Sequence, residues 1–280
     1  SVSLVLGIIL FILFSLIDVD VIAEKSLILY IISFLFICTL FIWGIAGDSG
    51  NRAWLRFGPI GVQPAEVVKI PFVIIVARTM IVLQERRGLN KPLSVAFLLA
   101  VFVIMFGIIV IASADMGSAL VYFFIFVVML FAGGLSLWWF LAGCAAIGVC
   151  LPLIWNFVLN AGQKARIMAP YDPSIDPSGL GVSWQANQSK AAISAGGLTG
   201  QGLYHGEMTQ SGSVPQQHTD FIFSAVGEEL GFIGCLAVAV LLLAIIARCF
   251  YVSYKSGYML GYLVCAGMGA MLIAQTLENI

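Results

Sequence analysis

Long runs of apolar residues, separated by short polar stretches, dominate the sequence. Most of these runs contain roughly 17–25 residues, enough for an α-helix to cross a hydrocarbon core about 30 Å thick. The pattern therefore predicts an all-α polytopic integral membrane protein. We expect about eight membrane-spanning helices, within residues 2–17, 27–47, 64–83, 93–113, 117–132, 137–159, 220–247 and 258–277.

Two of the runs depart from the length of a single crossing. The run 117–132 is short, and the run 220–247 would form a helix of about 42 Å at 1.5 Å per residue. The longer run also contains two acidic residues, Glu228 and Glu229. We expect residues 220–231 to form a helix in the outer interface or in a protein-lined pocket, so that the crossing itself begins near Phe232.

Composition and charge agree with a membrane protein, since 61% of the residues are hydrophobic and 10% are charged. These values exclude a water-soluble globular domain of this length, and no feature suggests a nucleic-acid partner. Basic residues in short connections mark the cytoplasmic side of a membrane protein. Alternation of the predicted helices places one group of them on the same side: Lys25, Arg86, Arg87, Lys91, Arg248 and Lys255.

The same alternation places residues 160–219 on the opposite side of the membrane. This polar, turn-rich segment is predicted to form a large extracytoplasmic loop within a single membrane domain that covers residues 1–280. Apolar runs begin almost at the first residue and stop just before the last one. That pattern favours a fragment that lacks one membrane segment at each end.

Charged residues in or beside the apolar runs are few, and each costs a few kcal/mol on membrane insertion. Asp220 lies where the polar loop turns into an apolar helix. It is either a carboxylate in the first helical turn, behind an N-cap at Thr219, or a general base at the membrane surface. Glu66 and Lys69 share one face of the helix that Pro64 opens. They form either a structural ion pair or a site whose cation binds a phosphate group.

Two further segments combine charge with other chemistry. The stretch from Arg52 to Pro59 places arginines beside aromatic rings. This is typical of an interfacial aromatic belt, but it also suits a pyrophosphate and a sugar. Glu228 and Glu229 could hold a metal or orient a base. A structural role is favoured for them, because the sequence shows no third possible metal ligand at a recognisable spacing from them.

Four stretches of the chain carry a family resemblance. They are Ala53-Trp54-Leu55 through Gln63-Pro64-Ala65-Glu66 to Lys69; Asp115-Met-Gly117; Lys164-Ala-Arg166 through Asp172-Pro173, Asp176-Pro177 and Gln188-Ser189 to Gly196-Gly197; and Pro215 through His218-Thr-Asp220-Phe-Ile-Phe223 to Gly227-Glu-Glu-Leu-Gly231. Together they resemble the motifs of the SEDS family (shape, elongation, division and sporulation), the RodA/FtsW/SpoVE-type polymerases of bacterial cell-wall peptidoglycan. The resemblance covers nearly the whole chain.

The resemblance implies a fold of ten membrane helices, of which this chain would lack the first and the last. It also implies glycosyl transfer from lipid II. In that reaction the 4-hydroxyl of one disaccharide unit attacks the anomeric carbon of another chain's sugar and displaces undecaprenyl pyrophosphate. Asp220 matches the family's essential loop aspartate, proposed to take the proton from the attacking hydroxyl. An α-linked donor that gives a β-linked product requires inversion, which suits one carboxylate base without a covalent intermediate.

Lys69 matches a motif lysine whose cation would offset charge that develops on the pyrophosphate. By resemblance, the substrate-binding residues are Lys69, Trp54, Arg56, Glu66, Arg166, Gln188, Ser189, His218 and Thr219. A divalent cation on the pyrophosphate, Mg²⁺ or Mn²⁺, is expected as well, with no ligands assigned to it. Gly206 and Gly212 favour the elongation type, which is RodA-like.

The resemblance also implies a bacterial plasma membrane, an extracytoplasmic active face and a class B penicillin-binding protein as partner. Two other functions stay open at this point. One is a flippase for lipid-linked cell-wall precursors, and the other is a scaffold that activates the penicillin-binding protein. A flippase is expected to line a path through the bilayer with its charges. Here the polar residues gather toward one face, which favours the enzyme.

Overall fold

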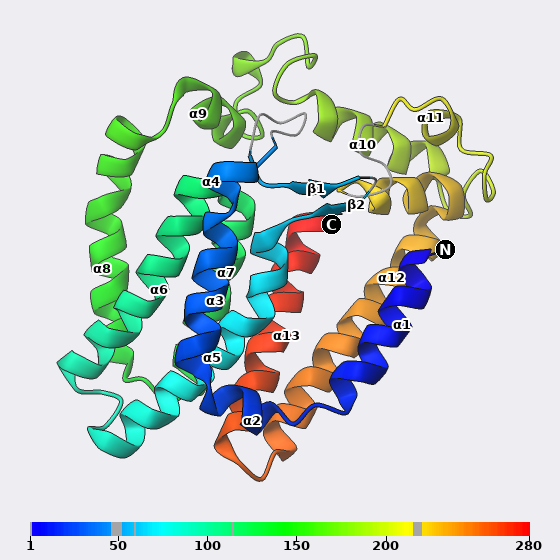
Figure 1. The fold of residues 1–280 in the computed structure, drawn as a ribbon. Coiled ribbons are helices and arrows are strands. Elements are labelled where there is room, and N and C mark those ends of the chain that lie inside the picture. The colour runs from blue at the N-terminus through cyan, green and yellow to red at the C-terminus, as the bar shows by residue number, and fades with distance from the viewer. Residues whose placement is uncertain (1, 46–51, 59, 114, 215–219) are drawn as a thin grey trace. The chain divides into compact units, whose positions relative to one another are not determined.

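Every predicted apolar run forms a helix in the structure, a computed structural model that describes residues 2–45, 52–58, 60–113, 115–214 and 220–280 (Figure 1). A short helix, α2 (Val19–Glu24), precedes the second run. The helices of the eight runs are α1 (Val2–Ser15), α3 (Ser26–Cys38) with α4 (Leu40–Trp43), α5 (Pro64–Arg86), α6 (Pro92–Ser113), α7 (Met116–Ala132), α8 (Leu137–Leu153), α12 (Ile222–Lys255) and α13 (Met259–Asn279). The predicted all-α polytopic fold is confirmed.

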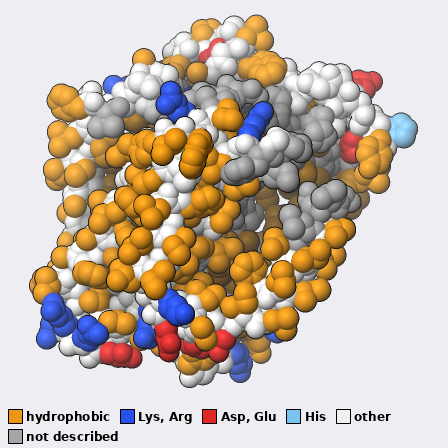
Figure 2. Space-filling model, viewed as in Figure 1, with side chains coloured by type: hydrophobic (Ala, Val, Ile, Leu, Met, Phe, Trp, Pro, Cys, Tyr) orange, Lys and Arg blue, Asp and Glu red, His pale blue; other side chains and the backbone are white. Residues whose placement is uncertain are grey.

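The helices have the dimensions and the surface of membrane segments. In the described part of the chain, five helical segments are long and apolar enough to cross a membrane, and α7 is a shorter apolar helix. Hydrophobic side chains cover the sides of the helices in Figure 2. Charged side chains lie near the ends of the helices in that view, with one group around α2 and the turn between α5 and α6. Such segregation is expected where apolar helices meet water on leaving a bilayer.

The chain forms two compact units, and the first comprises Ser1–Leu135 and Ile246–Gln275. Its central helix is α5, which packs against α2, α3, α6 and α7. The ring of Phe72 on α5 is fully buried and lies 5.0 Å from the ring of Tyr122 on α7. Helix α13 also comes close, because a Cβ atom at Gly267 would lie 2.6 Å from Cγ1 of Val73. Small residues permit such close approach between membrane helices.

A two-stranded hairpin precedes α5 and was not predicted from the sequence. Strands β1 (Leu55–Phe57) and β2 (Ile60–Val62) are antiparallel, with Leu55 opposite Val62. Gly58 has φ of 64°, a value that favours glycine, and it lies in the two-residue connection. The aromatic-belt interpretation considered only the composition of this stretch. It therefore missed the turn signal of a glycine and a proline between two β-forming segments.

The second unit comprises Ser136–Ile245 and Thr276–Ile280. After α8 the chain forms a short π-helix, η1 (Ile154–Val158), and then the polar segment 160–219. In its described part this segment contains the helices α9 (Ala161–Met168), α10 (Trp184–Gly196) and α11 (Glu207–Gln210) and a 3₁₀ turn, η2 (Pro173–Ile175). It is more helical than its turn-rich sequence suggested. Its membership of a single membrane domain, residues 1–280, stays a prediction.

Helix α12 is interrupted at Gly231, whose φ of 66° and ψ of −164° are not helical. The segment 197–202 fills the gap in the hydrogen-bond ladder. The amides of Phe232 and Ile233 donate to the carbonyls of Gly197 and Leu198, at 2.9 and 3.2 Å. On the other side of the break, the amides of Gln201 and Gly202 donate to the carbonyls of Glu228 and Glu229, at 2.9 and 3.0 Å. The interruption lies one residue before Phe232, where the crossing was expected to begin; the start of the crossing itself stays a prediction.

Candidate functional site

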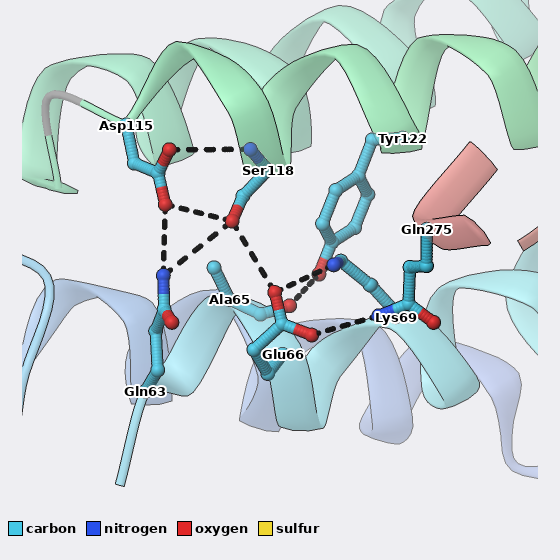
Figure 3. Close-up of polar contacts among 8 residues, drawn as sticks. All are labelled: Gln63, Ala65, Glu66, Lys69, Asp115, Ser118, Tyr122 and Gln275. Carbon is cyan, nitrogen blue, oxygen red and sulfur yellow. Dashed lines mark hydrogen bonds and ion pairs between the residues drawn. The ribbon is translucent and has the colours of Figure 1, made fainter. Parts of the chain in front are cut away.

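In the first unit, a network of polar side chains joins the N-terminal turns of α5 and α7 (Figure 3). Asp115 is the N-cap of α7, and its Oδ1 accepts a hydrogen bond from the Ser118 amide at 3.2 Å. Its Oδ2 accepts from Nε2 of Gln63 and from Oγ of Ser118, both at 2.8 Å. Carboxylates are favourable at a helix N-terminus because they satisfy free amides there. Asp115 therefore ties the start of α7 to the residue that precedes α5.

Lys69 lies at the buried end of this network. Its side chain is 2% exposed, and its ammonium lies 2.6 Å from Oε1 of Glu66. The Glu66 side chain is 41% exposed and also accepts a hydrogen bond at Oε2 from Gln275 of α13, at 3.0 Å. Within the described residues, Glu66 is the only hydrogen-bond partner of the Lys69 ammonium. The structural ion pair predicted as one alternative is thus present.

Two neighbouring groups complete the network. Ser118 Oγ lies 3.3 Å from Glu66 Oε1, so it connects the carboxylates of Asp115 and Glu66. The hydroxyl of Tyr122, one turn further along α7, donates to the Ala65 carbonyl at 2.7 Å. Both contacts hold the first turn of α5 against α7 (Figure 3). The arrangement holds the Lys69–Glu66 ion pair among hydrogen-bonding groups in an otherwise apolar surrounding.

Trp54 and Arg56, the other predicted substrate-binding residues of this unit, lie at the hairpin. Trp54 is exposed and its carbonyl accepts a hydrogen bond from the Ile45 amide at 2.9 Å. Its ring fits over Gly61, where a Cβ atom would lie 3.1 Å from the ring. Arg56 is in β1, opposite Gly61, and its side chain is exposed. Both side chains are thus available to a ligand, whose contact with them stays a prediction.

In the second unit, Asp220 lines a small open cavity of about 90 Å³. The walls also come from α10, from the start of α12 and from the end of the chain: Ser189, Ile193, Phe221, Phe223, Ser224, Glu278, Asn279 and Ile280. This volume is several times the roughly 10–15 Å³ that one water requires. The cavity can therefore hold a single polar group of a larger ligand that extends outside it.

Asp220 itself is exposed and precedes Ile222, the first residue of α12. The alternative that placed it in the first helical turn is therefore wrong, because α12 has no acidic residue in that turn. The expected N-cap, Thr219, and the predicted substrate-binding residue His218 lie outside the described residues. An exposed carboxylate in an open cavity has the access that a general base requires.

The remaining predicted residues of the second unit are only partly brought together. Ser189 lines the cavity with Asp220, whereas its neighbour Gln188 does not. Arg166 lies in the last turn of α9, where its side chain is exposed. A basic residue there is favourable at the negative end of the helix dipole. Substrate contact by Gln188 and Arg166 stays a prediction.

Glu228 is fully buried and holds the segment around Met208 and Thr209 in place. Its carboxylate accepts hydrogen bonds from the amides of Met208 and Thr209, at 2.7 and 2.8 Å, and from the Thr209 hydroxyl. A Cβ atom at Gly206 would lie 2.9 Å from Glu228 Oε2, so the carboxylate fits only because that residue is glycine. These contacts support the structural interpretation of Glu228.

Two aspartates hold turns of the polar segment. The pKa of Asp172 is lowered, chiefly by the hydrogen bond that the Ser174 hydroxyl donates to it. The pKa of Asp176 is lowered, chiefly by the hydrogen bond from the Ser183 amide. Hydrogen bonds to the ionised form have this effect. Both residues therefore act as turn formers.

The comparison that decides the family is a match over the whole chain. The family model of the cell cycle proteins FtsW, RodA and SpoVE matches residues 1–280. The chain belongs to this family. The resemblance to SEDS proteins is thereby confirmed.

Curated relatives within the FtsW/RodA/SpoVE family are moderately similar. The peptidoglycan glycosyltransferase MrdB of Escherichia coli (strain K12) is 32% identical over 254 residues, which are 90% of this chain and 66% of MrdB. A probable peptidoglycan glycosyltransferase FtsW of Trichlorobacter lovleyi is 32% identical over 255 residues, which are 90% of this chain and 64% of that protein. The chain thus spans just under two thirds of the length of these relatives.

Solved structures agree with the family assignment. A chain of the structure named "Structural coordination of polymerization and crosslinking by a peptidoglycan synthase complex" matches with a TM-score of 0.77 and 26% identity, over 97% of this chain and 74% of that one. The rod shape determining protein RodA of Thermus thermophilus matches with a TM-score of 0.66 and 23% identity, over 99% and 72%. The likeness to RodA shows that the two chains share a fold.

Several residues of these two sites were missing from the predicted substrate-binding set. In the first unit they are Gln63, Asp115, Ser118, Tyr122 and Gln275, and in the cavity they are Ser224, Glu278 and Asn279. Asp115 had a signal, because an acidic residue that opens an apolar run is a typical N-cap. Gln275 had none, because it reaches Glu66 across 209 residues of sequence.

Proposed function

We propose that this chain transfers glycosyl units from lipid II and so polymerises the glycan strands of peptidoglycan. The names of the curated relatives support this reaction. The observation that carries it for this chain is the exposed carboxylate of Asp220 in an open cavity that also contains hydroxyl and amide side chains. A sugar presents hydroxyl groups, and such a lining can both bind them and remove a proton.

In the proposed mechanism, Asp220 accepts the proton of the attacking 4-hydroxyl. The oxygen of this hydroxyl forms a bond to the anomeric carbon of the donor sugar. The bond between that carbon and the pyrophosphate oxygen breaks, and the electron pair leaves with undecaprenyl pyrophosphate. A single displacement of this kind inverts the anomeric centre and needs one base. A positioned carboxylate base contributes roughly 10²–10⁴-fold to such a reaction.

Lys69 is proposed to offset the charge that develops on the pyrophosphate. Its side chain is 2% exposed and paired with Glu66. A phosphate oxygen that displaces Glu66 can contact the ammonium directly and replace its acceptor. The exposure of Glu66 and its contacts with Ser118 and Gln275 provide other hydrogen-bond partners for the carboxylate after that displacement.

A divalent cation, Mg²⁺ or Mn²⁺, is a further expected component. Across the described ranges of the chain, no three His, Cys, Asp or Glu side chains form a group that could hold a metal ion. The described residues therefore offer no complete ligand set, and we derive no step through the cation.

The proposal includes a place and a partner. The active face is extracytoplasmic in a bacterial plasma membrane, because the basic connections are predicted on the cytoplasmic side. The partner is a class B penicillin-binding protein. The likeness to a chain of a peptidoglycan synthase complex supports this choice, since that complex is described as coordinating polymerization and crosslinking.

The test compares glycan synthesis by the full-length protein and by its Asp220→Asn variant, each purified with the partner and supplied with lipid II and Mg²⁺. We expect the variant to lose roughly 10²–10⁴-fold in rate. Asp172→Asn is the matched control, because this half-buried carboxylate accepts hydrogen bonds from Ser174 in a turn and does not line the Asp220 cavity, and it should retain most of the activity. Equal polymerisation by the parent and Asp220→Asn would overturn the assignment of the base. An inactive parent that moves lipid II across vesicles would favour the flippase.

A further inference from the structure

Two serine hydroxyls meet at the wall of the Asp220 cavity. Ser189 comes from α10 and Ser224 from α12, and their Oγ atoms are hydrogen-bonded to each other. Both residues line the cavity, but they differ in burial, since Ser224 is 2% exposed and Ser189 is half-buried. Ser224 follows Asp220 by four residues. The pair therefore connects α10 directly to the turn of α12 that follows the proposed base.

The hydrogen-bond capacity of this pair is not exhausted. A serine hydroxyl has one proton to donate and two lone pairs to accept. The mutual bond uses one of the two protons. In the described part of the chain, the two hydroxyls hydrogen-bond only to each other. One hydroxyl proton is therefore left for a partner outside the described residues.

Burial favours one of the two arrangements. Ser224 is 2% exposed and Ser189 is half-buried, so the Ser189 hydroxyl is the more accessible one, and a buried donor without an acceptor is costly. Either hydroxyl can donate in the mutual bond, and the arrangement in which Ser224 donates and Ser189 accepts leaves no buried donor unpaired. In that arrangement the proton of Ser189, the more exposed of the two residues, is available to a ligand in the cavity.

We propose that Ser224 is a positioning residue that fixes Ser189, so that the Ser189 hydroxyl donates to an oxygen of the saccharide whose attacking hydroxyl Asp220 deprotonates. The proposal rests on the proposed function. The ligand that these residues would bind is a sugar with two neighbouring oxygens. One oxygen accepts a hydrogen bond, and the other belongs to a hydroxyl that donates one. Ser189 supplies the donor and Asp220 the acceptor, and they line one cavity. Together the two side chains would recognise two neighbouring oxygens of one sugar ring.

The test is a double-mutant cycle on the full-length protein in nanodiscs with its partner. Ser189→Ala, Ser224→Ala and the double variant are compared in KM and kcat for lipid II, and in Kd measured directly with lipid II. A neutral hydrogen bond contributes modestly, so we expect each single variant to raise KM and Kd roughly 3–10-fold with little change in kcat. The double variant should be no worse than Ser189→Ala, because Ser224 acts only through Ser189.

Two controls separate positioning from folding. Ser224→Thr retains the hydroxyl and should bind lipid II nearly as the parent does. Ser253→Ala removes a buried hydroxyl that donates to the Tyr262 carbonyl at 2.7 Å, and it should leave KM unchanged. A purely structural role would give additive effects, or a loss of folded protein with KM unchanged in the folded fraction. Either result overturns the proposal.

The binding measurement keeps this proposal distinct from the proposed function. If the parent makes no glycan but the variants weaken lipid II binding as a coupled pair, the glycosyltransferase function fails and the role of Ser224 stands. If the parent makes glycan and all three variants match it in KM and Kd, the role of Ser224 fails alone. If the parent neither makes glycan nor binds lipid II, both are overturned.

Discussion

At the scale of single residues, the ion pair of Lys69 and Glu66 is asymmetric. The lysine side chain is 2% exposed and the glutamate side chain 41%. Removing one partner of a pair is most destabilising when the charge left behind is buried. Loss of Glu66 would leave a buried ammonium, whereas loss of Lys69 would leave a carboxylate that water can reach. The two substitutions should therefore not have equal effects.

We predict that Glu66→Gln lowers the free energy of unfolding by about 3–5 kcal/mol, the cost of an unpaired buried charge. Lys69→Met should cost clearly less, because its apolar replacement needs no partner. The measurement is the midpoint of unfolding in one detergent, with Glu85→Gln as the control on the exposed end of α5. A Lys69→Met variant as unstable as Glu66→Gln would contradict this account.

The sequence predicted this pair but only part of its surroundings. A spacing of three residues on one helical run was enough to place Glu66 and Lys69 on the same face. The partners Ser118 and Gln275 come from α7 and α13. Such contacts depend on how helices pack, which the apolar pattern does not encode residue by residue. The same reason explains why Ser224 was missed, although it follows Asp220 by only four residues.

At the scale of elements, the interruption of α12 depends on glycines at both sides of a close contact. Gly231 combines φ of 66° with ψ of −164°, a region that is essentially restricted to glycine. A Cβ atom there would lie 2.3 Å from the Gly200 amide nitrogen, and one at Gly200 would lie 2.1 Å from the Glu229 carbonyl oxygen. Any side chain at either position would push the segment 197–202 out of the gap.

We expect Gly231→Ala to destabilise the protein by about 1–3 kcal/mol from backbone strain alone, before the steric clash is added. Gly148→Ala is the control, because a Cβ atom at that α8 position meets nothing within 4 Å. It should be neutral or slightly stabilising, since alanine favours a helix over glycine. The comparison uses unfolding midpoints in detergent, together with hydrogen exchange at the Phe232 and Ile233 amides. Unchanged protection of these amides in Gly231→Ala would refute the role of the segment.

Elements with a strong apolar pattern were predictable, and those that depend on local turns were not. All eight runs became helices, because length and lack of charge suffice to identify them. A division of the run 220–247 near Phe232 was expected, because a single helix of that length is longer than one crossing requires, and the helix is interrupted at Gly231. The hairpin at Leu55–Val62 and the helices of the polar segment depend on turn geometry and caps such as Asn160. Composition does not reveal these features.

At the scale of the whole molecule, the membrane orientation is the property that decides where the proposed reaction takes place. Basic residues at the turn between α5 and α6 predict a cytoplasmic position for that turn. The described part of the turn carries Arg86, Arg87 and Lys91, all of them exposed. The polar segment 160–219 is predicted on the other side. Lipid II can be polymerised outside the cell only if this orientation is correct.

Labelling with a membrane-impermeant maleimide tests the orientation. We expect Ser178→Cys to react in intact spheroplasts and Lys91→Cys to react only after the membrane is opened. Both positions are exposed and lie outside the long apolar helices, so accessibility to water is matched. The parent protein with its six native cysteines gives the background. The opposite labelling pattern would place the Asp220 cavity in the cytoplasm and exclude the proposed function.

Residues 197–202 form the hydrogen bonds that α12 lacks at its interruption, and they are synthesised before α12. A helix that enters lipid with free amides loses several kcal/mol for each of them. The carbonyls that accept the Phe232 and Ile233 amides belong to Gly197 and Leu198, which leave the ribosome before α12 does. The hydrogen-bond acceptors for the interrupted helix therefore already exist when it is synthesised. Synthesis from the N-terminus to the C-terminus thus suits this structure. In the reverse order, the amides of Phe232 and Ile233 would enter the membrane before their acceptors had been made.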